Sequence, residues 1–232
     1  VLSAPESVAE MIKGSGADLN DFAYIPEPDV TEHNATLKVV MAARLLKDKG
    51  VYDFVECARI FNKQYSKCSP TVEFVLVGAP DLENPMSVTN AEFESWKQSD
   101  FITVLGARND VANIFQQSHI VVLPSYYGEG LPKVLIEAAA CGRPVITTDN
   151  PGCLEAVIKN ETALIVNAKQ PQEIVEAVWQ LVNNPEQRQK MGQKGREMAI
   201  AEFDVRSVAR RHIEIYQSVM LGNEPVEKVS VN

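Results

Sequence analysis

The sequence has few of the residues that build metal sites or disulfide scaffolds. Its 232 residues include three histidines and four cysteines, with neither a Cys-x-x-Cys pair nor histidines at metal-ligand spacing. The cysteines are therefore expected to be reduced, buried thiols of a cytosolic protein, and the scattered histidines suggest no metal site.

Long apolar runs and excess positive charge are also missing. No stretch approaches the roughly 20 apolar residues of a membrane span, and no signal-peptide pattern opens the chain. The net charge of −9 and the pI of about 4.9 argue against nucleic acid as a partner. What is present is an ordinary globular composition, 45% hydrophobic and 23% charged. The chain begins with Val1 rather than Met, which is typical of a processed product or an excised domain.

Six short apolar runs predict strands. They are continuous rather than alternating, which is typical of parallel strands buried on both faces. The runs cover residues 37–43, 72–77, 102–105, 120–123, 144–147 and 162–166. Helical patterns cover residues 50–65, 89–98, 109–117, 131–141, 154–158, 171–182, 185–202 and 205–220. This alternation predicts a doubly wound, Rossmann-like α/β domain with a parallel sheet and right-handed crossovers.

The composition divides the chain into four parts. Residues 1–36 are rich in Gly, Pro and Asp and are expected to form an interdomain linker and the end of a preceding domain. Residues 37–204 form the predicted Rossmann-like domain, residues 205–221 a C-terminal helix, and residues 222–232 a loose polar tail.

The helix predicted after the fourth strand carries an unusual carboxylate. This helix is almost entirely apolar except for Lys133 and Glu137, and an unpaired buried charge is unfavourable. In one interpretation these two side chains pair at i,i+4 on a solvated face, and Glu129 is an ordinary loop residue. In the other, backbone N–H groups from Gly130 onwards bind an anion at the helix start, with Glu129 and Glu137 on either side of it. Spacing alone leaves both open.

Several motifs together resemble the retaining glycosyltransferases of family 4, which have the GT-B architecture. Glu129 and Glu137 form the E-x7-E pattern of that family, and residues 131–149 are similar to its continuation in bacterial surface-polysaccharide members. Residues 43–50 resemble the family's strand-to-helix element, and residues 16–22 its interdomain segment. The resemblance extends over residues 14–220 with the motifs in the same order.

The resemblance implies that the chain is the C-terminal, donor-binding domain of a two-domain enzyme. Residues 37–204 would bind a nucleotide sugar, and a missing N-terminal domain would supply the acceptor site. The implied reaction moves a hexose with retention of configuration, without a metal, to a glycan or lipid-linked acceptor in polysaccharide biosynthesis. The resemblance also implies a UDP-linked donor and a cytoplasmic location, peripheral at the inner face of the membrane, since both are common in the family.

The resemblance also implies roles for four side chains. Glu137 would hold the ribose hydroxyls, and Glu129 a hydroxyl of the transferred sugar. Arg44 and Lys49 would neutralise the diphosphate, whose negative charge grows as the glycosidic bond breaks. We therefore assign Glu129, Arg44 and Lys49 to catalysis and Glu137 to donor binding.

Backbone N–H groups of Gly130, Leu131 and Lys133 are the further donor-binding groups. Many family members have Phe-Gly where this chain has Gly130 and Leu131, so the wall of the sugar pocket is not fixed by the resemblance. The Lys133 side chain is either a third phosphate cation or solvated. Arg108, after the third predicted strand, either lines the base pocket or is a solvated loop residue.

Two other classes of function compete with a glycosyltransferase. A non-catalytic nucleotide-sugar-binding module has the same sequence features, because the acceptor site would lie outside this chain in either case. A dinucleotide-dependent oxidoreductase is disfavoured, since no Gly-x-Gly-x-x-Gly follows the first predicted strand.

Overall fold

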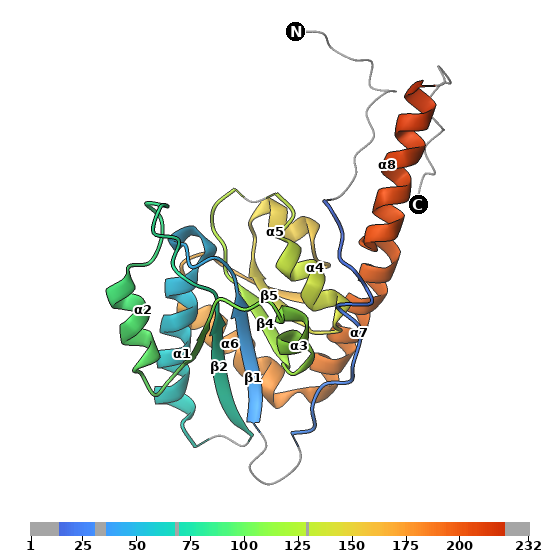
Figure 1. Cartoon of the computed structure of the whole chain (residues 1–232). Coiled ribbons are helices and arrows are strands. Elements are labelled where there is room, and N and C mark those ends of the chain that lie inside the picture. Colours follow the sequence, from blue (N-terminus) through green and yellow to red (C-terminus); the bar gives the residue numbers. More distant parts are fainter. Residues whose placement is uncertain (1–13, 31–35, 68–69, 129, 221–232) are drawn as a thin grey trace.

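The structure is a computed structural model that describes residues 14–30, 36–67, 70–128 and 130–220. Its centre is a parallel sheet with the strand order β3-β2-β1-β4-β5-β6 (Figure 1). The strands are β1 (Thr36–Ala42), β2 (Thr71–Val77), β3 (Thr103–Gly106), β4 (Ile120–Leu123), β5 (Val145–Thr148) and β6 (Ala163–Val166). The doubly wound, Rossmann-like α/β fold predicted from the apolar runs is confirmed.

The helices follow the predicted pattern closely. They are α1 (Val51–Tyr65), α2 (Asn90–Lys97), α3 (Val111–Gln116), α4 (Lys133–Ala140), α5 (Pro151–Glu155), α6 (Pro171–Asn183), α7 (Pro185–Glu202) and α8 (Val205–Met220). The prediction for α5 was wrong, because the helix begins with Pro151 at its first position rather than at residue 154. α4 begins two residues later than predicted, since Pro132 is extended and forms the N-cap.

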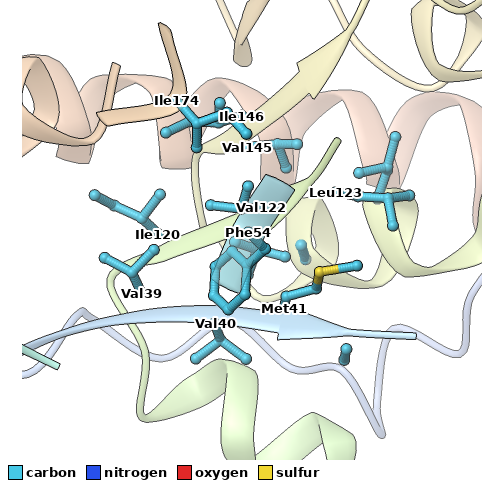
Figure 2. Close-up of a cluster of buried hydrophobic side chains, with 14 of the residues drawn as sticks. Val39, Val40, Met41, Phe54, Ile120, Val122, Leu123, Val145, Ile146 and Ile174 are labelled. Carbon is cyan, nitrogen blue, oxygen red and sulfur yellow. The ribbon is translucent and has the colours of Figure 1, made fainter. Parts of the chain in front are cut away.

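Right-handed crossovers place helices on both faces of the sheet. Figure 1 shows α1, α2 and α6 on one side and α3, α4 and α5 on the other. Figure 2 shows Phe54 of α1 among apolar side chains of β1 and β4. β4 and β5 are buried along their whole length, and β1, β2 and β6 are buried at most positions, which explains their continuous apolar runs; the edge strand β3 is partly exposed.

Residues 14–30 have no helix or strand but are fastened to the sheet domain. Three side chains of the sheet domain donate hydrogen bonds to carbonyls of this segment. They are Gln116 of α3 to Ala23, Arg143 of the α4–β5 loop to Ile25, and Arg196 of α7 to Phe22. Glu27 forms a bidentate ion pair with Arg188, whose side chain is 1% exposed. This segment therefore packs as part of the domain; its role as an interdomain linker stays a prediction. The predicted tail 222–232 lies outside the described residues.

Candidate functional site

Because the strand order reverses between β1 and β4, a sheet of this type is expected to have its binding crevice outside the carboxyl ends of these two strands. The chain crosses from β1 to β2 on one side and from β4 to β5 on the other, so the two crossovers run in opposite directions along the sheet. Ligands in such sheets bind at this switch point, outside the carboxyl ends of the strands. Predicted site residues follow both strands: Arg44 and Lys49 after β1, and Gly130 to Glu137 after β4.

The loops after β1 and β4 contact each other directly. A 3-10 turn over Lys47–Lys49 ends at Gly50, which has φ +76° and lies so close to Pro124 that an added Cβ would overlap the Pro124 carbonyl oxygen. The Asp48 carbonyl accepts hydrogen bonds from the Tyr126 N–H at 3.0 Å and the Ser125 hydroxyl at 3.1 Å. The sequence did not predict this turn. The turn fixes the backbone position of Lys49 relative to the β4–α4 loop.

Glu137 is the acidic group of the predicted site that lies among the described residues, and it is shielded from solvent. Its side chain is 14% exposed, against 61% for Lys133, whose ammonium group lies 3.6 Å away. Burial raises the pKa of the Glu137 carboxyl, and the charge of Lys133 opposes this rise only in part. The ion pair of the simpler interpretation is therefore present, but only Lys133 is solvated. A shielded carboxylate with a raised pKa at a crevice is a candidate ligand group.

The other predicted residues of the crevice are more exposed. Arg44 lies in an exposed ion pair with Asp81, 3.7 Å apart, a type of contact that typically stabilises by only about 0–1 kcal/mol. Gly130 is exposed, and Leu131 packs against Gly14 of the N-terminal segment. Glu129 lies outside the described residues, so its predicted contact with the sugar stays a prediction.

Arg108 belongs to a different part of the sheet edge. It follows β3, the edge strand, which is separated from β1 by β2. Its guanidinium donates two hydrogen bonds of 2.7 Å to the Asp110 carboxylate, a local pair in the β3–α3 loop. This pairing favours the solvated-loop interpretation of Arg108; a place in the base pocket stays a prediction.

Sequence reasoning missed a cation next to the β4–α4 loop. Lys169, which follows β6, has φ +60° and holds its ammonium group 4.6 Å from the centre of the Tyr126 ring. Burial raises the pKa of Asp53, in the first turn of α1, and the charge of Lys169 opposes this rise. The available signal was the position of Lys169 directly after a buried strand, at the binding edge of the sheet.

Two further properties hold for the part of the chain that the structure describes. None of its helices is long and apolar enough to cross a membrane. Among the same residues, no three His, Cys, Asp or Glu side chains are grouped as a metal site requires. Cys57, Cys141 and Cys153 are buried thiols, as predicted, and Cys68 lies outside the described residues.

Known proteins share both sequence and fold with this chain. Residues 27–198 match the family model of glycosyl transferases group 1. The N,N'-diacetylbacillosaminyl-diphospho-undecaprenol alpha-1,3-N-acetylgalactosaminyltransferase of Campylobacter jejuni is 33% identical over 182 residues, which cover 78% of this chain and 45% of that protein. The chain spans about half the length of the curated relatives it matches.

Solved structures agree with the sheet topology. HepE of Anabaena, determined in complex with UDP, has a TM-score of 0.71 at 20% identity and is matched over 88% of this chain and 56% of its own. The C-terminal domain of a glycosyl transferase group 1 family protein from Francisella tularensis has a TM-score of 0.64 at 21% identity, over 81% of this chain and 98% of that domain. These likenesses concern the fold. With the family match over residues 27–198, they lead to one conclusion: the chain belongs to the glycosyl transferases group 1 family.

Proposed function

We propose that this chain is the C-terminal, donor-binding domain of a retaining glycosyltransferase of family 4, and that its crevice binds a nucleotide sugar. The observation that carries the proposal is the shielded Glu137 carboxylate, on the first helix after the switch point. HepE, which has this fold, was determined with UDP, which supports a uridine nucleotide. The half-length match to relatives and the Francisella C-terminal domain support the placement in a longer enzyme.

Each group has a role that follows from its chemistry. Glu137 accepts hydrogen bonds from the ribose hydroxyls, because a desolvated carboxylate is a strong acceptor. N–H groups of Gly130, Leu131 and Lys133 meet the diphosphate at the start of α4, where the helix dipole favours an anion. Glu129 holds a hydroxyl of the transferred sugar.

Arg44 and Lys49 stabilise the departing diphosphate. Its negative charge increases as the bond to the sugar breaks, so fixed cations lower the barrier more than they strengthen ground-state binding. These cations take the part that a metal ion plays elsewhere, and the proposal requires neither a metal nor a protein nucleophile. Arg44 is released from Asp81 at little cost, because that pair is exposed.

The acceptor is a glycan or a lipid-linked sugar, bound mainly by a preceding domain. The Campylobacter relative, whose name contains diphospho-undecaprenol, supports a lipid-linked acceptor. A cytoplasmic location, peripheral at the inner face of the membrane, is part of the proposal. The second candidate is a nucleotide-sugar-binding module without transfer activity, which would use the same donor-binding residues.

Thermal unfolding with a panel of nucleotides tests the proposal. At ten times its Kd a ligand adds about 1.4 kcal/mol, which raises the Tm of a domain of this size by roughly 3–6 °C. We expect UDP to give this shift and GDP and ADP to give less. No shift with any of the three would contradict the proposal.

A further inference from the structure

Side-chain hydrogen bonds continue the contact between β4 and β5 after the backbone pairing of these strands ends. The last residue pair between β4 and β5 is Leu123 with Thr147. From this pair onwards, side chains at and after the end of β5 donate hydrogen bonds to every second carbonyl, first at the end of β4 and then in the β4–α4 loop. The Thr147 hydroxyl donates to Leu123 at 2.7 Å, the Thr148 hydroxyl to Ser125, and the Asn150 amide to Tyr127.

Asn150 has an unusual arrangement for a residue that precedes a helix. It is the N-cap of α5, yet its side chain does not accept a capping hydrogen bond. It is 9% exposed, and its Nδ2 group donates to the Tyr127 carbonyl, which is an acceptor only and so fixes the orientation of the amide. Its Oδ1 atom is buried and has no partner among the described residues. Helix capping and burial alone do not explain this arrangement.

We infer that Asn150, with Thr148, is a positioning residue for donor binding. It holds the Tyr127 carbonyl at the end of β5, while Asp48 holds the opposite side of the loop through Tyr126. The loop is thereby fixed from both sides just before the start of α4. The inference rests on the proposed function: the N–H groups that follow are those that meet the diphosphate. Asn150 acts through the backbone and does not touch the donor.

The test compares three variants of the full chain. N150D keeps the size of the side chain but replaces the donating NH2 group with an oxygen that repels the Tyr127 carbonyl. T148V keeps the β-branched shape and removes the hydroxyl. N183D is the matched control, because Asn183 also donates to a carbonyl, that of Trp179 at 2.8 Å, but on the exposed side of α6.

Hydrogen exchange measures positioning without reference to any ligand. Within residues 124–132, where Pro124 and Pro132 have no N–H, we expect the backbone amides to exchange about tenfold faster in N150D and T148V, which corresponds to ~1.4 kcal/mol of lost protection. N183D leaves them unchanged, and α7 keeps its protection in all three variants. Unchanged exchange in residues 124–132, or an equal increase in α7, would overturn the inference, since Asn150 would then be irrelevant to the loop or merely stabilise the fold.

Titration with UDP and UMP measures the consequence for the donor. We expect the Kd of UDP to rise about tenfold in N150D and that of UMP to change much less, because the loop leads to the groups that meet the second phosphate. Equal UDP affinity in N150D and wild type would overturn the inference. Absence of UDP binding by the wild type would instead overturn the proposed function, while exchange in residues 124–132 would still report whether Asn150 fixes the loop.

Discussion

Glu137 and Lys133 lie one turn apart in α4 with 3.6 Å between carboxylate and ammonium group, but the lysine side chain is far more exposed to solvent than the glutamate. The carboxylate is thus shielded, and its cationic partner among the described residues, Lys133, has an exposed side chain. Burial raises the pKa of Glu137 because the ammonium group compensates it only in part. This asymmetry makes Glu137 available to a ligand that brings hydrogen-bond donors.

Removal of Lys133 should raise the pKa of Glu137 further. Lys133→Met keeps the length of the side chain and removes the charge that opposes the effect of burial. An NMR titration of the Glu137 carboxyl carbon checks this, with Lys97→Met as control because Lys97 pairs with Glu94 on α2. A pKa of Glu137 that stays the same in Lys133→Met would show that the pair has no influence on the site.

The raised pKa of Glu137 makes stability depend on pH. Since the folded state holds the proton more tightly than the unfolded state, this group stabilises the fold fully below its unfolded pKa. The contribution is lost as the pH rises from the unfolded pKa through the folded one. Urea unfolding across this window should show wild type losing stability relative to Glu137→Gln as the pH increases. A constant difference between the two proteins would contradict the assigned shift.

Gly50 should be among the least replaceable residues at the crevice. Gly50→Ala places a methyl group against the Pro124 carbonyl and also forces alanine to φ +76°. Gly106→Ala is the matched control, because Gly106 has φ +72° and nothing within 4 Å of its added Cβ. We expect urea unfolding to show a loss of about 1–2 kcal/mol for the control and at least ~2 kcal/mol more for Gly50→Ala. Equal losses would mean that the two loops are not held together at Gly50.

The N-terminal segment should depend on one buried ion pair. Glu27→Gln leaves the Arg188 guanidinium buried and without its charged partner, and breaking such a pair typically costs about 3–5 kcal/mol. Glu197→Gln, which breaks an exposed pair with Lys194, is the control and should have little effect. Thermal unfolding checks both. Equal Tm values for the two variants would show that residues 14–30 are not fastened through Glu27.

Local pattern predicted the elements, and contacts between loops decided the site. The strands are found within a residue or two of the apolar runs, because burial on both faces leaves a continuous signal. α7 and α8 begin and end as predicted, and a capping box formed by Thr89 and Glu92 starts α2. These features depend on residues close together in the sequence.

The missed features all join distant residues. Asn150, which follows β5, donates a hydrogen bond to the carbonyl of Tyr127, which follows β4. Lys169, in the loop after β6, lies over the ring of Tyr126. No sequence spacing predicts such contacts, because the partner is a backbone carbonyl in one case and an aromatic ring in the other. The 3-10 turn before Gly50 likewise depends on the packing of Gly50 against Pro124, which no local propensity encodes.

Calorimetric titration of UDP into wild type and Glu137→Gln tests the central claim most directly. Glutamine keeps the shape of the side chain and removes the charge, so the hydrogen bonds from the ribose become neutral ones. We predict one UDP site in the wild type and a Kd at least about tenfold higher in Glu137→Gln. Glu176→Gln, on the exposed side of α6, should bind as the wild type does. Equal affinity of wild type and Glu137→Gln for UDP, or no binding to either, would contradict the assignment of this crevice to a nucleotide sugar.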